Sequence, residues 1–244
     1  MPSRDQDAYG RLIHDHYRGL TSAEVIERDD GWFGVSAGAL AYFAPYEKWP
    51  PHQQRAIRHA AGRVLDVGCG AGRVALHLQA RGHGVVAIDS SPLAVRTSRL
   101  RGVRDARVLP FTQIGRGLGE FDTVVMFGNN FGLFGNPRRA RWLLQRLRNL
   151  TSPAARIVAE SKNPYRGANA DHRRYHELNR RRGRLPGQLR IRVRYGHART
   201  PWFDYLLVSP REMGQIVGGA GWRVAKLVQS RGPLYIAVLE RMAP

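Results

Sequence analysis

The sequence of 244 residues has one cysteine, Cys69, and no apolar run that approaches the roughly 20 residues of a membrane-spanning helix. A single cysteine excludes an internal disulfide and leaves no thiol cluster for zinc, as is typical of proteins in a reducing compartment. The first ten residues are polar and carry both charge signs, unlike a secretory signal. These absences predict a cytoplasmic protein with no membrane partner and no metal site.

Acidic residues are also scarce: the sequence has 19 Asp and Glu but 39 Lys and Arg, which gives a net charge of +20. Such an excess raises the expectation of a nucleic-acid partner. Only Lys48, Lys162 and Lys226 are lysines, however, and a chain rich in Arg, Ala and Gly is also what a GC-rich coding sequence produces without selection for binding. Both explanations of the charge stay open.

What the sequence does have is a glycine-rich loop between an apolar run and a helical one. Residues 63–73 read RVLDVGCGAGR, in which Val64–Val67 predicts a buried strand and Arg73 begins a helix. A second apolar run, Val85–Ile88, ends on Asp89. A strand, a glycine turn, a helix and a second strand that ends on an acid predict half of a nucleotide-binding α/β fold.

The glycine spacing distinguishes among nucleotides. A dinucleotide fingerprint needs a third glycine where this chain has Arg73. The pattern Asp66-x-Gly68-x-Gly70-x-Gly72 instead resembles motif I of the class I S-adenosylmethionine (SAM) dependent methyltransferases. The resemblance implies that this loop, with Cys69, lies against the amino-acid end of SAM and that Asp66 orients its ammonium group. It also implies that Asp89, with Ser90 beside it, binds the ribose hydroxyls.

Two further stretches complete the cofactor site that the resemblance implies. Family members commonly hold the adenine amino group with an acid that follows the third strand. This chain has no acid at that position, and Asp105 comes too early in the sequence to take its place. We therefore expect Phe111 and Thr112 to lie against the adenine base. Residues 121–126, FDTVVM, match the fourth strand of the family. The residues after it are expected beside the sulfonium: Phe127, Gly128 and Asn129 for the cofactor, Asn130 and Phe131 for the acceptor.

The motif that follows the fourth strand also bears on the acceptor. DNA and RNA amino-methyltransferases carry (D/N)PP(Y/F) there, whereas this chain has Gly128-Asn129-Asn130. The similar tripeptide Asn163-Pro164-Tyr165 follows the fifth strand instead. The pattern therefore argues against methylation of an exocyclic amine of adenine or cytosine.

The resemblance implies a Rossmann-like, seven-stranded mixed sheet with helices on both faces. We expect residues 1–62 to form an N-terminal helical cap, with a helix start at Thr21 or Ser22, and residues 63–244 to form the core. Residues 162–209 are expected to be an insertion on the substrate side, after strand five. Within it, apolar and arginine residues alternate over Gln188–Tyr195, which predicts a strand of a β-hairpin.

Methyl transfer from SAM needs alignment and exclusion of water, and a base only if the acceptor loses a proton. His172 and His176 lie four residues apart, so on a helix they share a face, and we take them as the first candidates for the catalytic base. Aromatic side chains outside the core strands are candidates for the walls of an acceptor pocket. They are Tyr9, Tyr17, Trp32, Phe33, Phe131, Tyr165, Tyr175 and Trp202.

The leading hypothesis is a SAM-dependent methyltransferase that acts at O, N or C of a small molecule, such as an aromatic natural-product intermediate. The second is an RNA methyltransferase, motivated by the net charge and by the arginine clusters at 180–184 and 190–194. The third is a non-catalytic partner protein with the same fold.

Overall fold

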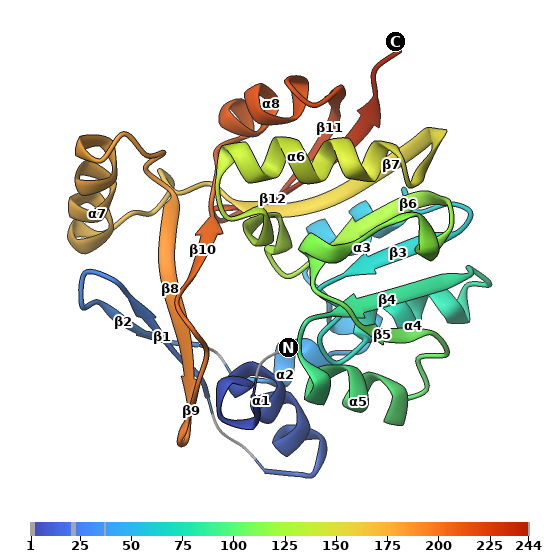
Figure 1. Ribbon diagram of the computed structural model, residues 1–244, viewed down its shortest axis with the longest axis horizontal. Helices are drawn as coiled ribbons and strands as arrows, with labels where there is room; N and C mark the ends of the chain where they lie inside the picture. The colour runs from blue at the N-terminus through green and yellow to red at the C-terminus, as the bar shows by residue number, and fades with distance from the viewer. Residues whose placement is uncertain (1–2, 21–22, 37, 244) are drawn as a thin grey trace. The chain divides into compact units, whose positions relative to one another are not determined.

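The computed structural model describes residues 3–20, 23–36 and 38–243 (Figure 1). The chain divides into two compact units. Unit 1 comprises Met1–Trp49, Gly62–Ile114 and Ile191–Phe203, and unit 2 comprises Pro50–Ala61, Gly115–Arg190 and Asp204–Pro244. Both units are built from segments that are distant in the sequence.

The centre of unit 1 is a parallel ladder of three short strands in the order β3 (Val64–Val67), β4 (Val85–Asp89) and β5 (Ala106–Val108). Every residue of β3 and β4 is buried, as expected of parallel strands covered on both faces. Helices α4 (Arg73–Ala80) and α5 (Pro92–Leu100) follow β3 and β4. This is the strand–turn–helix arrangement that the glycine loop predicted.

Unit 2 holds β6 (Phe121–Met126) parallel to β7 (Thr151–Lys162), and then the antiparallel strands β12 (Leu234–Arg241) and β11 (Trp222–Gln229). Its helices are α3 (Pro51–Ile57), α6 (Pro137–Arg148), α7 (Ala170–Arg181) and α8 (Pro210–Gly218). Together, the seven strands β3–β7, β11 and β12 belong to one mixed sheet. The predicted α/β fold class is therefore confirmed.

Local signals set the starts of the longer helices in unit 2. The Asn136 side chain accepts a hydrogen bond from the backbone N–H of Arg139, and Pro137 occupies the first helical position of α6. Ser209 and Glu212 form a reciprocal capping box at the start of α8. Both helices therefore begin at a cap whose residues lie within the local sequence.

The N-terminal segment contains more than helices. It has α1 (Ala8–Tyr17) and α2 (Leu40–Phe43), but β1 (Val25–Arg28) and β2 (Phe33–Val35) lie between them. Thr21 and Ser22 lie outside the described residues, but a helix that runs on from them is wrong because Val25–Arg28 is a strand. Val25 pairs with Arg194 and Ile26 with Val193, so pairing with a distant strand overrides the local helix signal.

The partner of β1 is β8 (Gln188–Tyr195), whose residues 191–195 belong to unit 1. The predicted β-hairpin is present, because β10 (Phe203–Leu206), which follows the loop at 196–201, is a neighbour of β8 in the sheet. Between them, β8 turns at Gly196 into the short strand β9 (Ala198–Arg199), with which it also pairs. Unit 1 therefore contains a small antiparallel sheet in the order β9, β8, β1, β2.

Short 3₁₀ helices connect the main elements: η1 (Arg4–Gln6), η2 (Tyr46–Lys48), η3 (Phe111–Gln113), η4 (Arg116–Leu118) and η5 (Asn130–Phe134).

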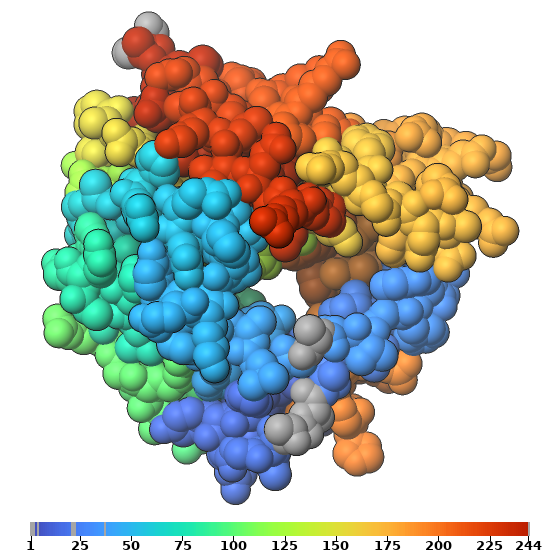
Figure 2. Space-filling model, turned by 180° about the vertical axis from the view of Figure 1, so that it is seen from behind, coloured from blue at the N-terminus to red at the C-terminus, as the bar shows by residue number. Residues whose placement is uncertain are grey.

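In unit 2, α7 and the residues around it, gold in Figure 2, lie at the surface. Arg173, Arg174, Arg180 and Arg181 are exposed on this helix. Among the described residues, no helix combines the length and the apolar character that crossing a membrane requires.

Candidate active site

The glycine loop of unit 1 has the backbone that only glycine adopts readily. Gly68, Gly70 and Gly72 have φ angles of 71°, 53° and 78°. At Gly72 there is also no room, because a Cβ atom would lie 2.5 Å from Cγ2 of Val103 and 2.8 Å from Oγ of Ser98. The three alternating glycines are thus explained by the tight turn from β3 into α4.

Two acids lie beside this loop, as the resemblance implied. Asp89 is 9% exposed and accepts hydrogen bonds from the backbone N–H groups of Gly70 (3.0 Å) and Ser91 (2.9 Å). Asp66 is 2% exposed, and its Oδ2 atom has no hydrogen-bond partner among the described residues. Burial raises the pKa of both carboxyl groups, that of Asp66 to about 7. A buried acid with an unused oxygen is a binding site for a cationic or hydrogen-bond-donating group.

Helix α1 packs against this part of unit 1 through Asp7. The two oxygens of its carboxylate accept hydrogen bonds from the backbone N–H of Gly10 and from that of Leu93, in the first turn of α5, at 3.1 Å each. Gly10 permits a close approach, since a Cβ atom there would lie 2.0 Å from Oγ of Ser91. The start of α1 is therefore fixed to the start of α5.

This docking places Tyr9 over the glycine loop. Its hydroxyl oxygen lies 3.5 Å from the position that a Cβ atom of Gly70 would occupy. The Tyr9 ring meets that of Tyr42 edge to face at 5.2 Å, and the Tyr42 hydroxyl donates to Glu24 at 3.2 Å. Glu24 is 2% exposed, and its Oε2 atom has no partner in the described part of the chain. Glu24 is a further buried acid in unit 1, which the sequence indicated only as part of the helix start expected at Thr21 or Ser22.

These groups fit the cofactor that the resemblance implies. SAM carries a sulfonium and an ammonium group, and buried carboxylates with unpaired oxygens supply negative charge and hydrogen-bond acceptors for such a cation. Five acids are buried in unit 1, in contrast with the overall charge of +20: Asp7, Glu24, Glu27, Asp66 and Asp89.

The other predicted cofactor residues of unit 1 are placed as follows. Phe111 is half-buried and Thr112 is exposed, both on η3, while Ser90 is exposed after β4. Cys69 is buried, and burial raises the pKa of its thiol, so the sulfur is held in its unreactive form. Asp105 precedes β5 and pairs with Arg107 at 2.7 Å, away from the carboxyl end of the strand.

In unit 2, a second buried acid centre lies at the loop after β6. Glu160 of β7 is 1% exposed and accepts hydrogen bonds from Nε2 of His52 (2.8 Å) and from the side-chain amide of Gln53 (2.9 Å). It also accepts from the backbone N–H groups of Gly128 (2.6 Å) and Asn129 (3.2 Å). Burial alone would raise its pKa, but the hydrogen bonds from His52 and Gln53 hold the pKa of Glu160 below its usual value. Sequence reasoning missed this residue, for which an acid directly after the apolar run at 157–159 was the only signal.

The loop that Glu160 holds has a strained backbone. Asn129 has a φ angle of 66°, and it is the one non-glycine residue with a positive φ among the described residues. Its carbonyl oxygen accepts a hydrogen bond from the Tyr205 hydroxyl at 2.7 Å. Its side-chain Oδ1 is buried and has no partner in the described ranges. Strain at a loop that a buried carboxylate holds is typical of a functional position.

Several predicted acceptor residues are accounted for by packing. Phe131 is fully buried, with its ring 4.9 Å from that of Phe134. Tyr175 is 1% exposed, and its hydroxyl accepts a hydrogen bond from the backbone N–H of Arg190. Trp32 lies over Gly34, where a Cβ atom would be 2.2 Å from the indole ring. These three rings are placed without a ligand.

The remaining candidates are more accessible. Tyr17 is 43% and Tyr165 is 44% exposed, and the Tyr165 hydroxyl donates to Glu212 at 2.6 Å. Phe127 is buried at the end of β6, and Asn130 is half-buried at the start of η5. Trp202 lies against the guanidinium of Arg192, 4.6 Å from the ring centroid.

The two candidate bases are both on α7, as their spacing predicted. The backbone N–H of His172 donates to the side chain of Asn169, which caps the helix. His176 is buried one turn later, and its ring lies 5.9 Å from that of Tyr165. Their catalytic role stays a prediction. Within residues 3–20, 23–36 and 38–243 there is no group of three or more His, Cys, Asp or Glu that could hold a metal ion.

Comparison with known proteins adds independent information. A family model described as a methyltransferase domain matches residues 64–154. A protein of Geobacillus sp. (strain WCH70), whose name assigns it provisionally to the methyltransferases, is 24% identical over 131 residues. That alignment covers 50% of this chain and 53% of the relative, so the chain matches about half the length of this curated relative.

The structural matches extend over nearly the whole chain. A SAM-dependent methyltransferase from Bacteroides fragilis, crystallised with S-adenosyl-L-homocysteine, matches with a TM-score of 0.83 and 25% identity, over 99% of this chain and 97% of that one. The CcbJ methyltransferase from Streptomyces caelestis matches with a TM-score of 0.64 and 18% identity, over 98% and 100% of the two chains, and so shows a shared fold. The first match includes the elements outside the α/β core.

Proposed function

Because this chain belongs to the class I SAM-dependent methyltransferases, we propose that it transfers the methyl group of SAM to O, N or C of a small-molecule acceptor. SAM is its cofactor. The observation that carries the proposal is the glycine loop flanked by the buried acids Asp66 and Asp89, in a chain that matches a methyltransferase bound to S-adenosylhomocysteine along 99% of its length.

The residues of unit 1 have distinct tasks in this proposal. Asp89 binds the ribose hydroxyls with the oxygen lone pairs that Gly70 and Ser91 leave unused. The unpaired oxygen of Asp66 accepts from the ammonium group. Bound SAM supplies a methyl group on a positively charged sulfur. The acceptor attacks the methyl carbon in line with the carbon–sulfur bond, and the sulfur leaves as the neutral thioether of S-adenosylhomocysteine. Tyr9 covers the loop and excludes water from it.

The residues of unit 2 have a positioning task. Glu160 and Tyr205 fix the backbone of Gly128 and Asn129, and the free Oδ1 atom of Asn129 is available to a hydrogen-bond donor of the cofactor or the acceptor. We retain His172 and His176 as the groups that take a proton from an acceptor that must lose one. The buried ring of His176 is the better shielded of the two.

The proposal and its two alternatives give different results in one experiment. Purified protein is incubated with radiolabelled SAM and an extract of the source organism, divided into a filtrate of small molecules and a macromolecular fraction. We expect S-adenosylhomocysteine to form with the filtrate and to form equally after ribonuclease treatment. Activity only with the macromolecular fraction, abolished by ribonuclease, would establish the RNA alternative. If calorimetry detected no SAM binding, both enzyme hypotheses would be excluded and the hypothesis of a non-catalytic partner protein would be supported.

Asp66 makes SAM affinity depend on pH. Its pKa is raised to about 7 in the free protein, so the carboxyl is mostly protonated below pH 7 and mostly ionised above it. A cationic ligand binds the ionised form, and affinity should therefore fall about tenfold for each pH unit below 7. Calorimetric titrations with SAM between pH 5.5 and 8.5 measure this slope. Asp66→Asn is the control for titration of SAM itself, and equal slopes in both proteins would contradict the assignment.

A further inference from the structure

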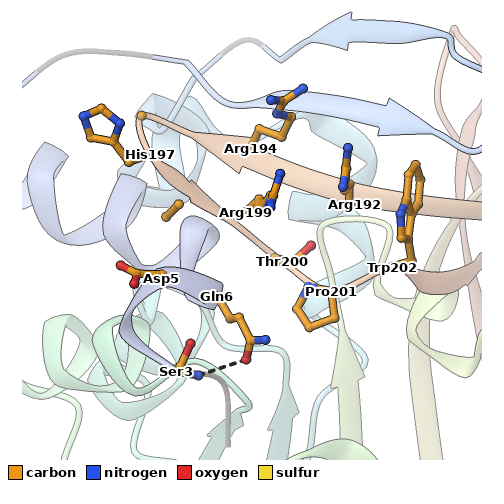
Figure 3. Close-up of a pocket in the computed structure, with 12 residues that line it drawn as sticks. Ser3, Asp5, Gln6, Arg192, Arg194, His197, Arg199, Thr200, Pro201 and Trp202 are labelled. Atoms are coloured by element: carbon orange, nitrogen blue, oxygen red, sulfur yellow. Dashed lines mark hydrogen bonds between the residues drawn. The ribbon is translucent and has the colours of Figure 1, made fainter.

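The β8–β9 hairpin of unit 1 carries an open cavity of about 850 Å³ that is lined by none of the predicted cofactor residues. Its basic and aromatic lining residues are Arg192, Arg194, His197, Arg199 and Trp202 (Figure 3). A volume of this size suits a small organic molecule. The cavity is therefore a candidate binding site in its own right.

The alternation of β8 explains why the arginines gather on one face. Val193 and Ala198 are buried against Ala8 of α1, so their neighbours in sequence face the other way. Arg194 of β8 stands directly opposite Arg199 of β9 in the antiparallel register. Like charges directly opposite each other destabilise a sheet, unless an anion lies between them.

The nearby carboxylates balance only part of this charge. Glu27, paired in register with Arg192 on β1, binds that guanidinium at 2.6 and 2.8 Å and reaches Arg194 at 3.4 Å. Hydrogen bonding to Arg192 lowers the pKa of Glu27, so this group is a carboxylate at neutral pH. Arg199 has no ion pair or hydrogen bond of its side chain in the part of the chain that the structure describes.

Asp5 is the acid among the lining residues of the cavity, and it is engaged elsewhere. Its carboxylate lies 3.4 Å from the guanidinium of Arg11 and is largely exposed. Three guanidinium groups thus face one carboxylate across the hairpin, which leaves two positive charges uncompensated. This excess is local and geometrically ordered, unlike the scattered surplus of arginine over the rest of the chain.

We propose that this cavity binds the phosphate group of a small phosphorylated molecule. A phosphate dianion matches the two uncompensated charges, and Arg194 and Arg199 present guanidinium groups from opposite strands, which suits the several oxygens of one phosphate. Trp202 holds Arg192 by a cation–π contact at 4.6 Å and adds an aromatic surface for the organic part of the ligand. None of the predicted cofactor residues lines this cavity, and of the predicted acceptor residues only Trp202 does.

The test uses inorganic phosphate and phenyl phosphate as probes, titrated calorimetrically into the full chain at constant ionic strength. Wild-type protein should bind both saturably, phenyl phosphate more tightly. Arg199→Gln should weaken binding about tenfold or more, because one charge-assisted contact is lost. Arg96→Gln is the matched control, since Arg96 is exposed on α5 outside the cavity and the charge change is the same. SAM affinity, measured in every variant, confirms that the fold is intact.

Several outcomes would overturn the proposal. One is the absence of saturable phosphate binding in wild-type protein, and another is equal weakening by Arg199→Gln and Arg96→Gln, which would mean a diffuse charge effect. If acetate bound as tightly as phosphate, the cavity would be a site for carboxylates and not a phosphate site. A single-stranded RNA that displaces phenyl phosphate and binds more tightly would replace it with a nucleic-acid surface. Loss of SAM binding in wild-type protein would count against the proposed function alone.

Discussion

Replacing Asp89 with alanine is expected to weaken SAM binding about 100-fold or more. Each hydrogen bond to a charged group contributes about 1.5–3 kcal/mol, and a loss of 1.4 kcal/mol is a tenfold loss of affinity. Two ribose hydroxyls lose their acceptor in this variant. The backbone N–H groups of Gly70 and Ser91 lose theirs as well, so the glycine loop itself is less firmly held. Calorimetric titration with SAM and with S-adenosylhomocysteine measures the effect.

The matched control is Asp105→Ala. Asp105 precedes the neighbouring strand β5 and is paired with Arg107 at the surface, so its removal should leave SAM affinity within a factor of two or so. Asp89→Asn retains the shape of the side chain and one oxygen acceptor, and it should give an intermediate loss. A dissociation constant for SAM that is the same in Asp89→Ala and wild type would refute the assignment of the ribose site.

Replacing Glu160 with alanine is expected to reduce the free energy of unfolding by about 3–5 kcal/mol. The carboxylate is almost completely buried, and its removal breaks the hydrogen bonds that it accepts inside unit 2 from His52, Gln53 and the N–H groups of Gly128 and Asn129. For a chain of this size, such a loss lowers the melting temperature by roughly 10 °C. Urea denaturation and thermal melting at pH 7 measure the two quantities.

The pH of that measurement follows from the direction of the pKa shift. The pKa of Glu160 is lowered in the folded protein, so its stabilisation is complete above the pKa of an unfolded glutamate and is lost as the pH falls through the lower, folded value. The difference between wild type and Glu160→Ala should therefore be full at pH 7 and shrink in strong acid. A difference that grows on acidification would contradict this account.

Glu240→Ala is the control for Glu160. Glu240 lies on the neighbouring strand β12, is partly exposed and pairs with Arg156 and Arg223 at the surface. Its removal should cost less than about 1 kcal/mol. Equal losses in the free energy of unfolding for the two alanine variants would contradict this account, because they would mean that the burial of Glu160 and its four partner groups do not contribute to stability.

Features that depend on neighbouring residues were predictable from the sequence. The glycine loop, Asp89 at the end of β4 and the caps of α6 and α8 all have their signals within a few residues of one another. Asp105 could likewise be set aside as the adenine ligand from its position before the strand. For these elements the local chain geometry is sufficient, because a turn, a cap or a strand end is a short-range structure.

Features that depend on distant partners were not predictable. His52 and Glu160 are 108 positions apart, and nothing in either local sequence indicates the other. Strand β1 forms because it pairs with β8. The local sequence of its four residues would also allow a helix. Phe131 and Tyr175 show the converse, since an aromatic residue near a predicted site has the same sequence signature whether it lines a pocket or fills the core.

The attachment of α1 through Asp7 has a consequence for the order of events during synthesis. The backbone N–H that Asp7 accepts from belongs to Leu93, 86 positions later in the chain. Translation proceeds at about 5–20 residues per second, so the first helix waits several seconds on the ribosome before its docking surface has been made. The α1 segment is therefore made well before the surface that it packs against, and the glycine loop is covered only after α5 has emerged.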